Sequence, residues 1–341
     1  MPNLEEIDLH VFITHFEPPT PTFVSYIRDF LRPRFSSEYL RSWARLVKHG
    51  TRGNQPWKKD VMTTVRRELD VLRLQFLNNQ ILVLAQLGVR SLTIDIHTNS
   101  TIASEKLKRI WHDLALNIQV HPQYDSMNTL NNSPWELDHG KSPWLLAWEH
   151  KKSMREAVAQ STSSSIFVSL ENDSLFTEPN LRYFLEYKDD LAERGLLPSF
   201  LRTEFSNLSD QFVAVDVFED TKLSLKDLPQ TKLSQQLFVQ LPNPYSGLII
   251  LDQIQAKSYV ESAAFSEIES RSLTWWDIGA RAAMGLQFVD VPEGFASRNV
   301  VPVSRNGQGV LKCAWVPHQP NLYVRKRNFT RGLTPSTLFH D

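Results

Sequence analysis

The sequence of 341 residues contains one cysteine, Cys313. A single cysteine excludes a disulfide framework and any zinc site built from cysteine ligands. The chain also lacks an excess of either charge, because 37 basic residues are balanced by 38 acidic residues and the formal net charge is −1. No global field therefore attracts nucleic acid or an anionic membrane, and we expect no nucleic-acid partner.

Long apolar runs are missing as well. No stretch approaches the ~18 consecutive apolar residues that a membrane-spanning helix needs, so we expect no integral membrane segment. The first six residues, Met1 to Glu6, are acidic and lack the apolar region of a signal peptide. Together these absences predict a soluble, cytoplasmic protein.

Three well-known glycine motifs are absent too. The chain has no Gly-x-Gly-x-x-Gly pattern, no Walker pattern and no Gly-x-Ser-x-Gly pattern. Their absence argues against dinucleotide-dependent oxidoreductases, phosphate-loop NTPases and α/β-hydrolases.

The first half of the chain alternates between strand-like and helical stretches. Strands are predicted at residues 9–16, 92–98, 117–120 and 165–171, and helices between them at 36–49, 59–87, 104–114 and 142–160. Strands that are separated by helices pair in parallel through right-handed crossovers. The pattern therefore predicts an α/β fold with a Rossmann-type sheet.

The second half predicts less regular additions. After a helix at 178–194, strands are expected at 197–205, 212–218, 237–241 and 248–251, and those at 212–218 and 237–241 are expected in mixed or antiparallel pairing. Asp252 and Gln255 have the spacing of a capping box and predict a helix at 253–262. No repeat or long linker separates independent domains, so we expect one large domain with a mixed sheet flanked by helices.

The buried strand at 165–171 ends in two acidic residues, Glu171 and Asp173. Acidic and hydroxyl residues at such a place often cap the helix that follows. The alternative is a metal site, because open α/β sheets bind ligands at the carboxyl ends of their strands and two close carboxylates favour a divalent cation.

Further motifs follow in a fixed order. Asn243-Pro244-Tyr245-Ser246-Gly247 leads into a strand, Asp277 follows Trp275 and Trp276 at the start of a predicted helix, and His318 stands near the C-terminus. This succession, over residues 7–320, resembles the glycosyltransferases of the GT-A fold, which use nucleotide-sugar donors. A more local resemblance, to uncharacterised glycosyltransferase-like proteins, lies in His150-Lys151, the acid motif and the stretch 198–204.

The resemblance implies roles for these residues. Glu171 and Asp173 would hold Mn²⁺ or Mg²⁺ against the donor diphosphate, with His318 as a third ligand that favours Mn²⁺. Asp277 would be the catalytic base of an inverting enzyme, and the acceptor side would include Tyr245, Ser246, Gly247, Trp275 and Trp276. The chain departs from the family at Glu171, where aspartate is common and whose longer side chain can reach a cation through water, and at Trp276, where glutamate is usual.

The remaining candidates each have two interpretations. Nucleobase or ribose contacts are expected at the strand-end residues Thr14, His15, Asp95 and His97, which otherwise serve as turn residues. Lys151 is either a phosphate contact or a solvated lysine. Arg202 and Glu204 either form an ion pair within the sheet edge or bind the acceptor.

These expectations combine into one functional hypothesis. Residues 1–180 form the nucleotide-sugar-binding half and residues 181–341 the acceptor-side half of a metal-dependent glycosyltransferase that acts on a glycan or another hydroxyl-bearing acceptor. Two alternatives are a nucleotidyltransferase-like metal enzyme and a non-catalytic carbohydrate-binding or scaffold protein on the same fold.

Overall fold

The computed structural model of the chain describes residues 3–15, 74–98, 111, 116–122, 146–206, 209–217, 222–243, 245–265, 298–320, 324 and 333–340. The chain divides into two compact units, one formed by residues 1–16 with 76–341 and the other by residues 17–75. All strands of the described residues belong to the first unit. The predicted helices at 36–49 and after Thr274 lie outside the described residues, as do most of those predicted at 59–87 and 104–114.

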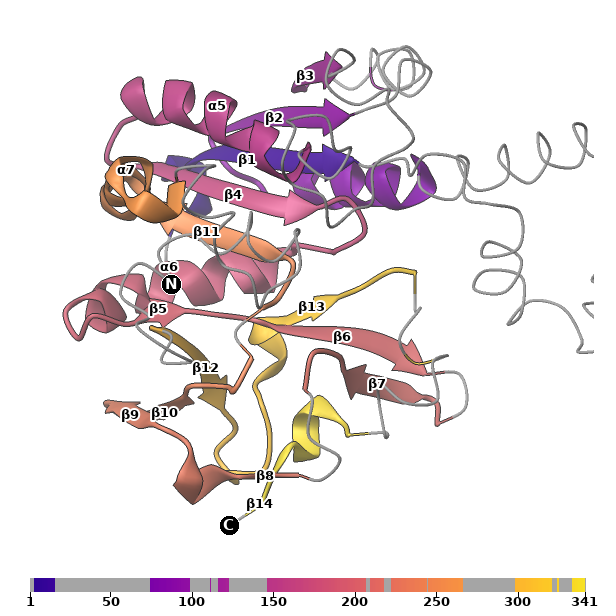
Figure 1. The fold of residues 1–341 in the computed structure, drawn as a ribbon, viewed down its shortest axis with the longest axis vertical. Coiled ribbons are helices and arrows are strands. Elements are labelled where there is room, and N and C mark those ends of the chain that lie inside the picture. Colours follow the sequence, from indigo (N-terminus) through magenta and orange to yellow (C-terminus); the bar gives the residue numbers. More distant parts are fainter. Residues whose placement is uncertain are drawn as a thin grey trace, which may run out of the picture. The chain divides into compact units, whose positions relative to one another are not determined.

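A five-stranded sheet forms the centre of this unit (Figure 1). Its strand order is β11-β4-β1-β2-β3, with β1 at Asp8–His15, β2 at Ser91–Thr98, β3 at Asn117–Pro122, β4 at Ser165–Glu171 and β11 at Leu248–Asp252. Strands β1 to β4 pair in parallel, and β11 runs antiparallel to β4. The predicted parallel series and the mixed sheet are therefore confirmed.

Three labelled helices accompany the sheet, α5 (Leu146–Ala159), α6 (Glu178–Ala192) and α7 (Gln253–Glu261). Residues 74–85 are also helical. The predicted capping box of α7 is confirmed, because the Asp252 side chain accepts from the Gln255 backbone amide and the Gln255 side chain accepts from Asp252. This reciprocal pair satisfies two amides at the helix start that otherwise lack partners.

Both faces of the sheet are covered. On one face, α5 and α7 pack against the strands in a core cluster of Phe12, Met154, Val158, Phe167, Ile249, Leu251, Ala256, Tyr259 and Phe265. Val11, Ile13 and Val168 alternate with the sheet members of this cluster, and they too are 0% exposed. A strand buried on both faces reads as a continuous apolar run, which is why residues 165–170 were recognisable in the sequence.

The second half of the chain adds three small sheets. Their strand orders are β5-β12-β10-β9, β13-β6-β7 and β14-β8. The strands are β5 (Leu197–Pro198), β6 (Leu201–Ser206), β7 (Gln211–Ala214), β8 (Leu223–Ser224), β9 (Gln230–Leu233), β10 (Gln236–Val239), β12 (Asn299–Val303), β13 (Trp315–Pro317) and β14 (Phe339–His340). Short 3-10 helices lie at Leu4–Glu6, Leu225–Asp227, Ala263–Phe265, Lys312–Ala314 and Pro335–Thr337.

Two predicted strands of this half need correction. The strand predicted at 197–205 is divided into β5 and β6, because β5 pairs with β12 whereas β6 pairs with β7 and β13. The strand predicted at 212–218 ends at Ala214. The backbone turns at Asp216, whose φ of 25° lies in the left-handed region that non-glycine residues rarely adopt. Among the described residues no helix is long and apolar enough to cross a bilayer.

The buried histidine of α5 makes a testable contribution to stability. His150 is 1% exposed, and its Nδ1 donates to the carbonyl oxygen of Ala147 at 2.8 Å. Burial lowers the pKa of His150 from 6.5 to about 3, with a smaller effect of Lys151 in the same direction. In the unfolded chain His150 therefore binds a proton near pH 6.5, whereas in the folded protein it stays neutral until the pH falls to about 3.

We predict that the stability that this histidine contributes is complete above pH 6.5 and is lost as the pH falls toward 3. Between pH 6.5 and 5 the contribution of His150 to the free energy of unfolding should fall by about 2 kcal/mol, at 1.36 kcal/mol per pKa unit. Urea denaturation at both pH values measures it. The His150→Gln variant should lose about 2 kcal/mol less than the wild type over this interval, and an equal loss in both proteins would contradict the assignment.

Candidate functional site

The end of β4 lies at the place where the strand order of the sheet reverses. From β1 the order proceeds through β2 to β3 on one side, whereas β4 lies on the other side of β1. In open α/β sheets ligands bind outside the carboxyl ends of the strands at such a switch point. Here the two strand ends are joined, because the Asn172 amide donates to the Thr14 carbonyl oxygen at 3.3 Å and the Asn172 side chain donates to His15 Nδ1 at 2.9 Å.

The segment after β4 pairs with the segment after β13. The Leu175 amide donates to the Pro317 carbonyl oxygen at 2.9 Å, and the Gln319 amide donates to the Asp173 carbonyl oxygen at 2.8 Å. The His318 amide donates in turn to the Thr203 carbonyl oxygen of β6 at 2.7 Å. His318 is therefore fixed by its backbone between the acid motif and β6.

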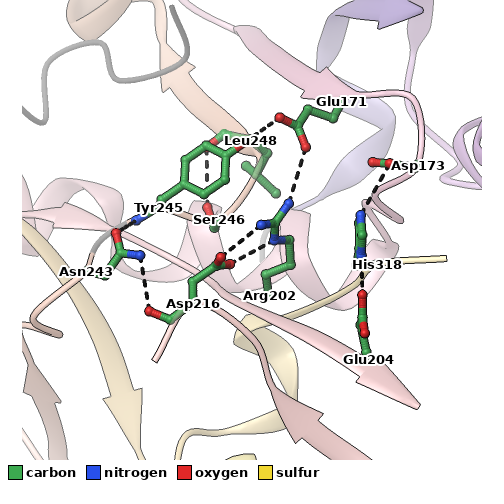
Figure 2. Close-up of polar contacts among 10 residues, drawn as sticks. All are labelled: Glu171, Asp173, Arg202, Glu204, Asp216, Asn243, Tyr245, Ser246, Leu248 and His318. Carbon is green, nitrogen blue, oxygen red and sulfur yellow. Dashed lines mark hydrogen bonds and ion pairs between the residues drawn. The ribbon is translucent and has the colours of Figure 1, made fainter. Parts of the chain in front are cut away.

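Asp173, His318 and Glu204 form a linear network (Figure 2). His318 Nε2 lies 3.2 Å from Asp173 Oδ2, and His318 Nδ1 lies 2.5 Å from Glu204 Oε1. Glu204 is 0% exposed, and its Oε2 accepts from the Val324 amide at 2.7 Å. Asp173 Oδ1 is buried, and this oxygen of the carboxylate has no hydrogen-bond partner within the described residues.

The network shifts the acidities of its members. Burial acts to lower the pKa of His318, but Asp173 and Glu204 outweigh it and raise the pKa to about 9. Burial acts to raise the pKa of Asp173, but the charge and hydrogen bond of His318 outweigh it and lower the pKa. The protein alone therefore favours an imidazolium between two carboxylates, an arrangement that places positive charge directly beside Asp173.

Glu171 belongs to a second network (Figure 2). The Tyr245 hydroxyl donates to Glu171 Oε1, and Arg202 Nη1 donates to Glu171 Oε2 at 3.3 Å. Arg202 also donates twice to Asp216, from Nε and Nη2, at 2.8 Å in each case. Burial raises the pKa of Glu171, although Arg202 opposes the effect.

Asp216 and Asn243 were not predicted as site residues. Asn243 ties this network together, because its side chain donates to the Asp216 carbonyl oxygen at 3.1 Å and accepts from the Tyr245 amide at 3.1 Å. Asp216 does leave a signal in the sequence, since it interrupts the apolar stretch from Phe212 to Val217. A charge within such a stretch requires a buried partner. Nothing in the sequence says that the partner is Arg202.

Asp173 and His318 could hold a divalent cation, for which His318 would have to release its Nε2 proton. Metal-binding histidines usually donate their other ring nitrogen to a carboxylate, as His318 does to Glu204. The unpartnered Oδ1 of Asp173 and the imidazole suit Mn²⁺. In the part of the chain that the structure describes, no group of three or more histidine, cysteine or acidic side chains is arranged to hold a metal. Asp173 and His318 are thus two residues that could hold a cation here, and phosphate oxygens and water would have to complete its coordination.

The residues predicted on the nucleotide side lie together at the carboxyl edge of the sheet. Thr14 of β1 is in register with His97 of β2, and His97 is in register with His121 of β3. The His97 ring stacks on the His121 ring at 4.8 Å, and His121 Nε2 lies 2.6 Å from Asp95 Oδ1. Both ring nitrogens of His97 are buried without a partner. The edge thus carries polar groups beside the acid motif, and their predicted contact with a nucleoside stays a prediction.

The other predicted residues have mixed outcomes. Arg202 and Glu204 are 3% and 0% exposed, so both are buried, and the partners described above are Asp216, Glu171 and His318. Lys151 is buried rather than solvated, and its ammonium donates to the Ala264 carbonyl oxygen at 3.0 Å. Ser246 Oγ donates to the Leu248 carbonyl oxygen at 3.4 Å. Trp275, Trp276 and Asp277 lie outside the described residues.

Comparisons with known proteins add no relative. No family model matches the chain, and no curated protein matches it.

Gly247 lies against Ser174 and Glu171, and its need for a glycine can be tested. Its φ of 71° favours glycine, and a Cβ there would lie 3.0 Å from Ser174 Oγ and 3.3 Å from Glu171 Oε2. Gly195 has a similar φ of 68°, but a Cβ there would meet nothing within 4 Å. Both Gly→Ala variants should therefore lose ~1–2 kcal/mol through backbone strain.

We predict that Gly247→Ala loses about 1 kcal/mol more than Gly195→Ala in urea denaturation, because the added methyl group crowds the site. The excess should shrink in the double variant Gly247→Ala/Ser174→Ala, which removes the nearest atom. Equal losses in the two single variants would show that the site has room for the methyl group.

Proposed function

We propose that the protein is a metal-dependent glycosyltransferase of the GT-A type, built on a single large α/β domain. It would transfer a sugar from a nucleotide-sugar donor to a hydroxyl group of a glycan or another acceptor. The observation that carries the proposal is the pair of Asp173 and His318 at the switch point of the sheet, with Glu204 orienting the imidazole.

The position of this pair supports a diphosphate ligand. Asp173 follows β4, next to the end of β1, and Thr14, His15, Asp95 and His97 line the same edge of the sheet. A nucleoside on that edge would place its diphosphate near Asp173. The loop with Tyr245, Ser246 and Gly247 approaches the acid motif from the second half of the chain, which suits an acceptor side.

The chemistry of sugar transfer explains why such a pair is useful. A bound Mn²⁺ or Mg²⁺ would neutralise the charge that develops on the departing nucleoside diphosphate. Asp173 and His318 would hold the cation, and Glu204 would keep the imidazole oriented. In an inverting reaction a carboxylate must also accept the proton of the attacking hydroxyl, which typically contributes ~10²–10⁴-fold. Asp277 is the residue that we propose for this step.

Two other functions differ from this one in what the protein would bind. A nucleotidyltransferase-like enzyme would use a nucleoside triphosphate, and a non-catalytic carbohydrate-binding protein would need no metal at Asp173. No geometric feature of the described residues favours either of them over sugar transfer, and the experiment below separates all three.

We predict that UDP or GDP binds to the protein in the presence of Mn²⁺ and that removal of Mn²⁺ abolishes binding. Asp173→Asn should weaken Mn²⁺-dependent binding at least about tenfold, and Glu204→Gln, which removes the negative charge that orients the imidazole, about 10–100-fold. Isothermal titration calorimetry measures each affinity. Asp190→Asn is the matched control, because Asp190 is an exposed acid of α6, and it should bind as the wild type does.

Three outcomes would count against the proposal. If neither nucleotide binds with Mn²⁺, the donor site does not exist. If binding is independent of Mn²⁺ and of Asp173, the carbohydrate-binding alternative is favoured. If UTP or GTP binds with Mn²⁺ but a nucleotide-sugar does not compete, the nucleotidyltransferase alternative is favoured.

A further inference from the structure

The helix at residues 74–85 has a polar residue within its buried face. Leu77, Gln80, Ile81 and Leu84 have the spacing that places side chains on one face of a helix, and all four are 0% exposed. The side-chain amide of Gln80 is therefore buried beside apolar residues and needs hydrogen-bond partners. Those partners identify the segment that the helix holds.

Gln80 binds the backbone shortly after the acid motif. Its Oε1 accepts from the Phe176 amide at 2.9 Å, and its Nε2 donates to the Phe176 carbonyl oxygen at 3.4 Å. One side chain thus satisfies both backbone groups of Phe176, in the way that a residue of a neighbouring antiparallel strand does. Phe176 is itself 0% exposed. The buried helix therefore fixes the end of the turn that carries Asp173.

This contact completes a series of backbone hydrogen bonds along the turn. The Asn172 amide donates to β1 and the Leu175 amide donates to the segment after β13, as described above. The Phe176 amide has Gln80 as its acceptor. A buried amide that loses its acceptor destabilises the conformation in which it is buried. Asp173 is thus held on one side by β1 and on the other by the helix.

The same helix contacts Gln319, the residue that follows His318. Gln319 Nε2 donates to the Phe76 carbonyl oxygen at 3.0 Å, and Asn79 Nδ2 donates to Gln319 Oε1 at 3.2 Å. The contacts with both segments come from residues 76–80, which make about one turn of the helix. One rigid element therefore holds the two segments from which the candidate cation ligands extend.

We propose that Gln80 and Gln319 are positioning residues that hold Asp173 and His318 at the spacing that a divalent cation needs. Neither glutamine touches the cation in this role. Ligands must be held within about 0.5 Å of the productive geometry, and groups that orient them contribute about 10–100-fold to metal affinity. This role rests on the proposed function, which assigns the cation to Asp173 and His318.

Mn²⁺ alone, without nucleotide, tests this role in the full chain. Electron paramagnetic resonance of free Mn²⁺ measures its affinity for the wild type and for Gln80→Met, which keeps most of the volume but removes both hydrogen bonds. We expect Gln80→Met to bind Mn²⁺ about tenfold more weakly. Gln236→Met is the matched control, because Gln236 Nε2 also donates to two backbone carbonyl oxygens, those of Leu237 and Val303, and it should bind Mn²⁺ as the wild type does.

A double-variant cycle separates positioning from a general loss of stability. If Gln80 acts through Asp173, Gln80→Met should weaken Mn²⁺ binding by less than about twofold when Asp173 is already asparagine. A merely structural role would instead lower the fraction of folded protein and reduce the apparent affinity by the same factor in both backgrounds. Equal factors in the wild-type and Asp173→Asn backgrounds would overturn the proposal.

Gln319→Met tests the role without changing the buried face of the helix. Gln319 is only partly buried, so this variant should fold even if Gln80→Met does not. It should bind Mn²⁺ about threefold more weakly or worse, because it releases the segment of His318. Wild-type affinity in Gln319→Met would overturn the positioning role and leave the proposed function standing. If the wild type itself binds no Mn²⁺, the proposed cation site and the positioning role fail together.

Discussion

The buried guanidinium of Arg202 is the constraint on which the arrangement of the site depends. A charge that is 4% exposed must be neutralised and hydrogen-bonded, and Arg202 finds acidic partners in Asp216 and Glu171. One of these acids follows β7 and the other ends β4, so the ion pairs connect the small sheet of the second half to the central sheet. The same contacts fix the carboxylate of Glu171.

Backbone hydrogen bonds also hold the site residues in place. Residues 173–175 and 317–319 exchange hydrogen bonds, and His318 is held by β6 as well. The site therefore contains side chains from four separate parts of the chain: the end of β4, β6 with the turn after β7, the loop before β11 and the residue after β13. Each network contains its own carboxylates. Glu171 and Asp173 therefore have different hydrogen-bond partners, although only one residue separates them in the sequence.

The features that the sequence predicted are those with a local cause. The strands β1 to β4 were predicted because buried strands between amphipathic helices have a periodic pattern, and the start of α7 was predicted because Asp252 and Gln255 satisfy each other's amides. The break between β5 and β6 was not predicted, since it arises from the pairing of each strand with a different partner. Asp216 was missed for a related reason, because its partner Arg202 is 14 residues away and no sequence pattern identifies it.

The sequence by itself determined the α/β class, the parallel pairing of the first four strands and the presence of two acids at the end of a buried strand, since propensity, periodicity and strand-end chemistry act over a few residues. Only the tertiary structure decided that His318 contacts Asp173 and Glu204 and that Arg202 and Tyr245 donate hydrogen bonds to Glu171. These contacts join residues that are 31 to 145 positions apart. Their physical cause is that buried charges need partners of opposite charge. The sequence contains many acids and bases that could serve as partners, and only the pairing of the sheets decides which of them meet.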